Sequence, residues 1–465
     1  HWGRLHVRVA RQRSLAIGGL IRIDNVRVYR KPRLQLTTSV QHNVARPNEQ
    51  IRIHCVATGI KGDVPQVEFE VLDLEGNAVV TKSAPLNYDN PSHDSERQAE
   101  HRPHFVSKQA LARPRNGTAT SVVSLPQPGL YTVRAHLGGR TQDIQGRSLM
   151  LAVLESQVAV KAGPFGWSIP AFGPFLKPAD VPELAAKFGA GWVKFPIWFD
   201  MEDTASADAL VAMTERLQAS GIRCIGRLDE PPPSQRSAFA DADQELFTRN
   251  MFREKETWEP FLEPVLTRLG MRLTWFQLGR DDDLSLMGDD HVTDFLAEIR
   301  ETMQAYCQQL KLTVGWNWLN PTPSEEGIFP WQSVHYRTAP QLSSQELAHY
   351  VESTSESSQQ TWINLEPLPA SKYSLRDRVR DLTERVIEVR RLGIEAAFHP
   401  NPFAEETGIF RPDSTVTEML VPWHQLVSRC GQAAYVGSIH MPAGSTNHVF
   451  ENGRRGFMVI WNDRS

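Results

Sequence analysis

The N-terminal third of the chain alternates apolar and polar residues. Residues 50–57, 67–74 and 129–136 each place an apolar side chain at nearly every second position, the pattern of a strand with one buried face. The second of these runs is followed by Glu75-Gly-Asn, which supplies a turn. Short strands with this spacing predict a β-sandwich over residues 33–160.

The pattern changes near residue 163, where short apolar runs begin to alternate with amphipathic helical stretches. The strand candidates are 165–171, 192–199, 222–228, 273–279, 312–318, 332–337, 361–366 and 394–399. The clearest helical stretches between them are 206–219, 292–309, 343–357 and 375–392. Eight such units predict a (β/α)8 barrel over residues 161–444. A doubly wound sheet is the alternative fold, but it offers no reason for eight units.

Four of the predicted helices end in the same sequence pattern. A glycine follows the last helical residue and a buried strand comes next, at Gly189, Gly221, Gly270 and Gly393. Glycine adopts the left-handed conformation that closes a helix at little cost. Its recurrence at four junctions indicates one repeated βα architecture.

Composition narrows the function classes. The 465 residues include 50 basic and 54 acidic side chains, a net charge of −4, which is too balanced to indicate a nucleic-acid surface. No apolar run approaches the roughly 18 residues that cross a bilayer. Cys55, Cys224, Cys307 and Cys430 are too far apart for a zinc motif, so we expect buried free thiols. We expect no metal and no organic cofactor.

In such a barrel, functional residues lie where the strands end at their carboxyl side. Those positions here combine aromatic rings with carboxylates: Asp229 and Glu230 after the third strand, Asp281 and Asp282 after the fourth, and Glu366 after the seventh. Aromatic faces stack on pyranose rings, and paired carboxylates cleave glycosidic bonds. Phosphate-loop, dinucleotide, nucleophile-elbow and zinc-protease motifs do not occur in the sequence. The sequence therefore predicts a carbohydrate substrate.

The region from Phe165 to about Gly444 resembles the large clan of retaining glycoside hydrolases built on (β/α)8 barrels. Members often carry W-x-[IL]-[GW]-N-E-P at strand four, where the Glu is the acid/base, and a second Glu, the nucleophile, at the end of strand seven. Thr-Trp-Ile-Asn-Leu-Glu at 361–366 matches the second position. The resemblance therefore implies that Glu366 is the nucleophile and Asp281 the acid/base. The chain departs from the motif at strand four, where Arg280 replaces the Asn and Asp281 replaces the longer Glu.

Other residues at the strand ends are candidates for substrate binding. We expect this role for Trp167, Lys194, Trp198, Arg280, Trp316, Trp318, Tyr336 and His399. Core packing is the alternative for Trp316 and Trp318, and an ordinary hydrogen-bonded histidine is the alternative for His399. Asp282 and Glu230 are alternative proton donors. A buried Lys194 requires an anionic partner, for which Asp200 and Glu366 are the candidates.

The flanking segments indicate a multidomain protein. Residues 1–32 resemble the end of a jelly-roll module, and residues 33–160 resemble an immunoglobulin-like module. Residues 445–465 resemble the beginning of a further β-domain. Because the chain begins at His1 without a signal segment, we expect a piece of a longer protein. The resemblance implies an extracellular or periplasmic location, whereas the oligomeric state has no signature in the sequence.

Three functions stay open at this point. The first is a retaining glycoside hydrolase that acts on a polysaccharide or oligosaccharide. The second is a catalytically inactive barrel that binds carbohydrate or supports its neighbours in a large secreted or surface protein, as the altered strand-four motif suggests. The third is an isomerase or aldolase barrel that uses Lys194 as its amine.

Overall fold

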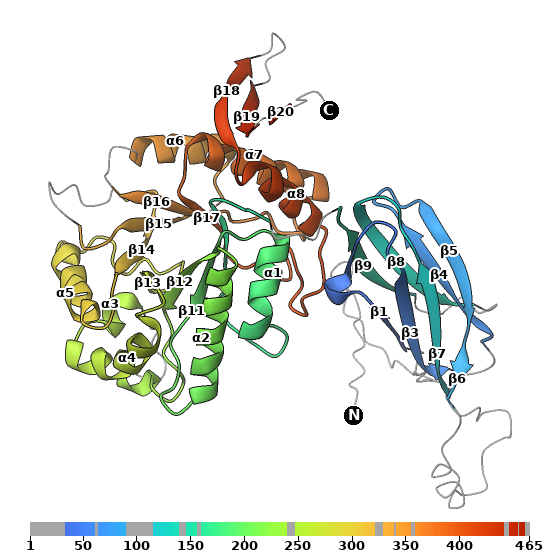
Figure 1. The fold of residues 1–465 in the computed structure, drawn as a ribbon, viewed down its shortest axis with the longest axis horizontal. Coiled ribbons are helices and arrows are strands. Elements are labelled where there is room, and N and C mark those ends of the chain that lie inside the picture. Colours follow the sequence, from blue (N-terminus) through green and yellow to red (C-terminus); the bar gives the residue numbers. More distant parts are fainter. Residues whose placement is uncertain are drawn as a thin grey trace, which may run out of the picture.

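The computed structural model describes most of the chain, which forms a β-sandwich beside an α/β barrel (Figure 1). The described residues are 33–60, 64–89, 115–138, 146–155, 160–239, 247–320, 329–338, 341–354, 359–440, 446–453 and 455–460. The predicted jelly-roll end at 1–32 lies outside them.

Two antiparallel-rich sheets form the sandwich. The first has the order β1-β3-β7-β6 and the second β2-β9-β8-β4-β5. Their strands are β1 (Arg33–Thr38), β2 (Val44–Ala45), β3 (Ile51–Ile60), β4 (Gln66–Leu72), β5 (Ala78–Pro85), β6 (Asn87–Tyr88), β7 (Arg115–Val123), β8 (Gly129–Leu137) and β9 (Arg147–Val153). Every second side chain of β3, including Ile51 and Cys55, is buried in the core that the two sheets share. The predicted sandwich is confirmed; an immunoglobulin-like topology stays a prediction.

A closed barrel of eight parallel strands follows, as the sequence predicted. Its strands are β10 (Phe165–Ser168), β11 (Trp192–Pro196), β12 (Arg223–Leu228), β13 (Trp275–Leu278), β14 (Lys311–Asn317), β15 (Ser333–Arg337), β16 (Gln360–Asn364) and β17 (Ala396–His399). Strand β17 pairs with β10 and closes the barrel. Each strand lies within or beside its predicted range, because a short apolar run between turn signals is typical of a buried parallel strand.

Helices cover the outside of the barrel. They are α1 (Val181–Phe188), α2 (Thr204–Ala219), α3 (Thr248–Met251), α4 (Lys255–Leu269), α5 (Val292–Gln304), α6 (Ser344–Thr354), α7 (Leu375–Arg391) and α8 (Leu420–Cys430), with short 3₁₀ turns at Gln41–Asn43, Pro178–Asp180 and Arg236–Ala238. Helix α7 begins after Ser374, whose side chain accepts a hydrogen bond from the backbone N–H of Asp377. Its buried residues include Leu382, Val386 and Val389, at helical spacing.

The helix-ending glycines follow the prediction at three junctions. Gly189, Gly221 and Gly393 have positive φ angles of 91°, 75° and 66°. Gly270 instead keeps a right-handed conformation, with φ −64°. A Cβ atom there would lie 2.5 Å from the carbonyl oxygen of Tyr306, so close packing against the next helical region explains this glycine.

A three-stranded antiparallel sheet follows the barrel. It consists of β18 (Ala434–His440), β19 (Thr446–Asn452) and β20 (Arg455–Val459), and it lies over α6 and α7 (Figure 1). Phe450 is buried in the same apolar cluster as the barrel helices. A β-element after the barrel agrees with the sequence-based expectation.

Two further sequence-based expectations concern chemistry and membranes. All four cysteines are buried and unbridged, and burial raises the pKa of the Cys224 thiol to about 12. Among the described residues, no helix combines the length and apolar character needed to cross a bilayer.

Candidate functional site at the open end of the barrel

A layer of polar side chains lies inside the barrel, next to a layer of mostly aromatic side chains that we call the aromatic floor. Lys194, Gln277 and Asn364 each lie two residues after a tryptophan on the same strand. Because side chains on a strand alternate between its two faces, these residues share the inward face with that tryptophan. The floor contains Trp192, Trp275 and Trp362 together with Ile225, Ala396 and Phe398.

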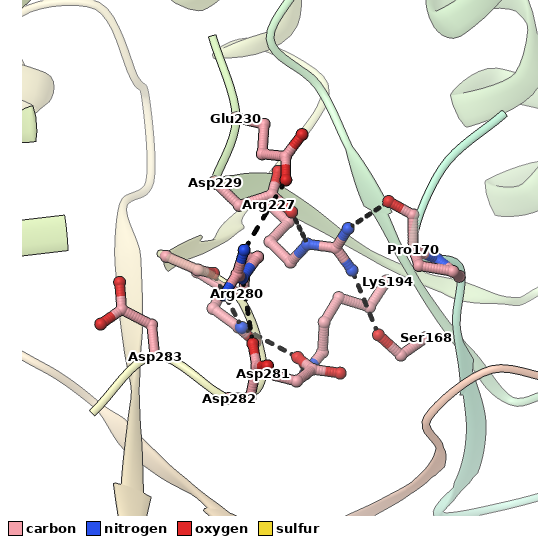
Figure 2. Close-up of polar contacts among 12 residues, drawn as sticks. Ser168, Pro170, Lys194, Arg227, Asp229, Glu230, Arg280, Asp281, Asp282 and Asp283 are labelled. Carbon is pink, nitrogen blue, oxygen red and sulfur yellow. Dashed lines mark hydrogen bonds and ion pairs between the residues drawn. The ribbon is translucent and has the colours of Figure 1, made fainter. Parts of the chain in front are cut away.

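Lys194 and Asp281 form a buried ion pair at the centre of this layer. Their Nζ and Oδ1 atoms are 2.7 Å apart, and the Lys194 side chain is fully buried whereas that of Asp281 is 15% exposed. Figure 2 shows the two side chains pointing toward each other. Burial disfavours the Asp281 anion, but the charge of Lys194, helped by Arg227, outweighs it and holds the pKa of Asp281 well below its usual range.

A histidine and an amide extend this pair across the barrel. Lys194 Nζ lies 3.0 Å from His335 Nδ1, and His335 Nε2 lies 2.9 Å from Asn364 Oδ1. Burial lowers the pKa of His335 to about 3, and the neighbouring Lys194 charge acts in the same direction. Burial also lowers the pKa of Lys194 to about 8, although Asp281 opposes that shift. At neutral pH, Lys194 is therefore a cation and His335 is neutral.

A second buried ion pair joins strands β10 and β12. The guanidinium of Arg227 bonds Asp229, the hydroxyl of Ser168 and, at 2.7 Å, the carbonyl of Pro170 (Figure 2). Burial raises the pKa of Asp229, and the Arg227 charge offsets only part of the effect. The pair anchors the loop after β10 to the barrel mouth.

Glu366 lies at the end of β16 with its side chain 22% exposed. Its backbone is held from outside the barrel, because the Arg385 guanidinium of α7 donates to its carbonyl at 2.8 Å. Burial raises the pKa of the Glu366 carboxyl. The Arg337 charge acts against this increase, and the Asp281 anion adds to it. The nearest cation, Arg337, has its Nε 3.8 Å from the carboxylate, beyond hydrogen-bonding distance.

Alternating charges continue from Glu366 around the rim. Asp282 lies 4.0 Å from Arg337 and 3.0 Å from Arg280, and Arg280 lies 3.8 Å from Glu230. These side chains are between one third and one half exposed. The altered residue Arg280 thus belongs to an ion-pair network that spans several strand ends.

The turn after β13 is built to present Asp281. Gly279 has a φ of 79°, and a Cβ atom there would lie 2.0 Å from the hydroxyl of Thr248, so only glycine fits. Asp283 points away from the ion pairs (Figure 2) and accepts hydrogen bonds from the N–H and hydroxyl of Thr248. Of the three consecutive aspartates, one faces the barrel interior, one joins the rim and one anchors the turn.

The structure buries six of the eight residues expected to contact sugar, and a substrate-binding role for them stays a prediction. Trp167, Lys194, Trp198, Trp316, Tyr336 and His399 are all buried. Trp167 packs edge-on against Phe410 at 5.9 Å between ring centroids, and the indole N–H of Trp198 bonds Gln235 at 2.9 Å. Such rings present no open face to a pyranose. Of the eight candidates, Trp318 and Arg280 are partly exposed.

The alternation of side chains along a strand explains part of this burial. Trp316 and Tyr336 are register partners on β14 and β15, and both belong to the core between the strands and the helices. His399 meets Trp423 of α8 edge-on at 5.7 Å, and burial lowers its pKa to about 4. These side chains lie on the outward faces of their strands, toward the helices. From the sequence alone, an aromatic residue near a strand end can be either a packing residue or a substrate-binding residue.

The structure also corrects the expected partner of Lys194, which is Asp281 rather than Asp200 or Glu366. Asn364 and Gln277 were not proposed as site residues, yet both lie in the polar layer. Each lies two residues after a tryptophan, Trp362 or Trp275, that faces the barrel interior. This spacing in the sequence could have identified both as inward-facing residues.

A separate hollow lies on the outside of the barrel. A cavity of about 650 Å³ lies outside the barrel, between α6, α7 and the β18–β19 hairpin, where it is lined by residues such as His349, Arg391 and His440. Within the described ranges, His, Cys, Asp and Glu side chains form no cluster suited to a metal ion.

Comparison with solved structures finds chains of similar fold. No family model and no curated protein sequence matches the chain. A family 39 glycoside hydrolase from the gut symbiont Bacteroides cellulosilyticus WH2 superimposes with a TM-score of 0.59 at 10% identity, over 90% of this chain and 88% of that chain. A broad-specificity GH5-4 endoglucanase from Clostridium acetobutylicum matches 58% of this chain and 98% of its own at 11% identity, with a TM-score of 0.40. The chain therefore has a glycosidase-like (β/α)8 fold with additional β-domains.

Proposed function

We propose that this protein is a glycoside hydrolase that acts on a polysaccharide or oligosaccharide at the open end of the barrel. One observation carries the proposal. Asp281 and Glu366 follow strands β13 and β16 at the same end of the barrel, and their surroundings lower the pKa of the first carboxyl group and raise that of the second. Glycosidic cleavage needs one ionised and one protonated carboxyl group.

The retaining course of the reaction follows from the resemblance to the retaining clan. In that course, one carboxylate attacks the anomeric carbon and the other donates and later accepts a proton. The Asp281 anion helps to raise the pKa of the Glu366 carboxyl, which supports the assignment of these two carboxyl groups to the reaction. Trp318, stacked at 4.3 Å on the buried Tyr336, is the proposed sugar-stacking residue, and Arg280 is the proposed polar contact.

Hydrolysis of a broad panel of polysaccharides and aryl glycosides tests the proposal, with reducing ends or released phenol as the readout. We expect the parent protein to cleave at least one member and Glu366→Gln to lose about 100-fold or more of that activity. Glu215→Gln on the outer surface of α2 is the matched control, since Glu215 is an exposed residue whose ion-pair partner among the described residues is the exposed Arg272. Equal activity of parent and Glu366→Gln would overturn the proposal.

A carbohydrate-binding barrel without hydrolytic activity is the second candidate. Its supporting observation is that Asp281 and Asp282, the two residues at or beside the acid/base position, are each paired with Lys or Arg. A parent protein that binds an oligosaccharide in calorimetry but hydrolyses nothing in the panel would favour this candidate.

An extracellular or periplasmic location is part of the proposal. A glycan-degrading enzyme meets polymeric substrate outside the cytoplasm. Fractionation of the producing cells, with detection by an antibody, tests this: recovery in the cytoplasmic fraction alone would contradict it.

A further inference from the structure

We propose that Asp281 is the carboxylate that stays ionised and attacks the sugar, and that Glu366 is the proton donor. This assignment reverses the roles implied by the resemblance. It rests on the proposed function and deepens it, because it names what each carboxylate does. The argument starts from how each side chain is held.

Asp281 is anchored through one oxygen and open at the other. Its Oδ1 accepts hydrogen bonds from Lys194 Nζ at 2.7 Å and from Gln277 Nε2 at 2.9 Å. Within the described part of the chain, no recorded hydrogen bond reaches Oδ2. A carboxylate fixed by two donors on one oxygen presents the other in a defined direction, as a nucleophile requires.

The hydrogen-bond inventory of the surrounding network requires this carboxylate to be an anion. The Lys194 ammonium has three N–H bonds and no acceptor. They are directed at Asp281 Oδ1, at His335 Nδ1 and at the face of Phe398, whose ring centroid is 4.4 Å from Nζ. His335 Nδ1 must therefore accept, so its proton resides on Nε2 and is donated to Asn364 Oδ1. The imidazole is neutral, and Asp281 is the anion in direct contact with Lys194.

Glu366 has the opposite surroundings. Its position is fixed through the backbone, by Arg385 at the carbonyl and Thr338 at the N–H. Its carboxyl group has Arg337 no closer than 3.8 Å. A carboxyl group without a tight cationic partner, partly buried and close to other anions, takes up a proton more readily than a paired one.

The charged groups that face the two carboxyl groups also indicate that Glu366 takes up a proton more readily than Asp281. Around Glu366 they are Arg337 from β15, Arg385 from α7, and Asp281 and Asp282 from the turn after β13. The two anions offset the two cations, and burial decides the direction.

Around Asp281 the charged neighbours with the largest effect are cations. They are Lys194 from β11 and Arg227 from β12, with the neutral His335 of β15 at 3.5 Å. A protonated Asp281 would leave the buried Lys194 charge unpaired, which is costly.

The chemistry then proceeds in two steps. Glu366 transfers its proton to the glycosidic oxygen as that C–O bond breaks, and Asp281 Oδ2 forms an ester bond to the anomeric carbon, so the aglycone leaves as an alcohol. Water then attacks the anomeric carbon, the ester bond breaks to regenerate the Asp281 carboxylate, and the Glu366 carboxylate takes the proton from water.

Carboxyl titration tests the ionisation order without any substrate. Protein labelled with ¹³C at the carboxyl carbons of Asp and Glu is titrated by NMR, and Asp281→Asn and Glu366→Gln assign the two resonances. We expect Glu366 to protonate at a higher pH than Asp281, and Asp281→Asn to lower the midpoint of Glu366. Protonation of Asp281 before Glu366 would overturn the assignment.

Two variants test whether Lys194 positions and ionises Asp281. Lys194→Met should raise the Asp281 midpoint by about one pH unit or more. If that variant does not fold, Gln277→Leu removes the other donor and should shift the midpoint in the same direction by less. Asp208→Asn, at an exposed site on α2, should leave both midpoints unchanged. An unchanged Asp281 midpoint in the folded variants would contradict the role of the anchor.

Azide rescue tests the catalytic roles with 2,4-dinitrophenyl glycosides, whose leaving group needs no proton. In Asp281→Ala, azide replaces the missing nucleophile and gives a glycosyl azide of inverted configuration. In Glu366→Ala, azide attacks the glycosyl-enzyme and gives retained configuration. The opposite pair of products would overturn the role assignment alone. A parent protein that hydrolyses nothing in the panel would overturn the proposed function instead.

Discussion

The inside of the barrel contains two layers of opposite chemistry on the same strands. The lower layer is aromatic, and Trp275 and Trp362 lie 4.6 Å apart between ring centroids. Two residues further along, the same strands carry Gln277 and Asn364, and β11 carries Lys194 after Trp192. Both layers are almost completely buried, so the difference between them lies in chemistry and not in exposure.

This difference shows what each layer must satisfy. Apolar side chains need only volume complementarity, because dispersion and burial stabilise them without direction. Polar side chains need specific partners, since an unpaired buried charge is expensive. The floor therefore closes the barrel, whereas the polar layer orients Asp281 toward the mouth. The following variants test that division.

Trp362→Ala should have the largest effect on stability. Trp362 is completely buried and contacts both Trp192 and Trp275, so we expect a loss of about 4 kcal/mol in the free energy of unfolding. Denaturant unfolding measures it. The half-exposed Tyr373→Ala is the control, with a change within about 0.5 kcal/mol. A loss below about 1 kcal/mol for Trp362→Ala would mean that the floor is not a packed core.

Lys194→Met tests the polar layer. It leaves the Asp281 carboxylate in the barrel without its main partner, and we expect a loss of about 3 kcal/mol in the free energy of unfolding. Adding Asp281→Asn removes the unpaired charge and should recover part of the loss. Strictly additive losses in this double-mutant cycle would show that the two side chains do not interact.

The polar layer, which contains His335, should make the stability of the protein depend on pH, whereas the aromatic floor should not. His335 has an ordinary unfolded pKa near 6.5 and a folded pKa of about 3. Between these values the unfolded state binds the proton and the folded state does not, so stability falls as the pH decreases through this window. One such site contributes about 2 kcal/mol between pH 6.5 and 5.

Unfolding of parent and His335→Gln at several pH values measures this contribution. The free energy of unfolding of the variant should fall less steeply than that of the parent between pH 6.5 and 5, by about 2 kcal/mol over that window. Above pH 7.5 the two curves should run parallel, separated by a constant amount. His349→Gln, at an exposed position on α6, should retain the slope of the parent. Parallel curves for parent and His335→Gln would contradict a neutral, buried His335.

Arg223→Gln should have the smallest effect. The Arg223 guanidinium lies 3.7 Å from the ring centroid of Trp192 and pairs with the half-exposed Glu395. A cation–π contact at such an exposed site is worth about 0.5–1 kcal/mol. Thermal unfolding measures it, and a loss comparable to that of Lys194→Met would show that the floor also depends on charge.

Much of the fold could be predicted from periodicity. The eight strands of the barrel and helices such as α7 follow from apolar spacing and helix-ending glycines, which are local properties. The strand ends also indicated where Glu366 and Asp281 would lie. Prediction failed for Gly270, whose conformation depends on Tyr306. For aromatic residues such as Trp316 the sequence left core packing and sugar stacking open, because inward and outward faces of a fully buried strand have similar composition.

The sequence by itself determined the order of strands and helices, the separate β-rich region and the set of acids at the strand ends. Only the tertiary structure decided that Lys194 would meet Asp281 and His335 rather than Asp200 or Glu366. The reason is that barrel closure brings β11, β13 and β15 around one axis, and the resulting burial and Coulomb interactions set which carboxyl group holds its proton. Periodicity encodes which face a residue occupies, but its electrostatic environment comes from neighbours that are 87 and 141 residues away along the chain.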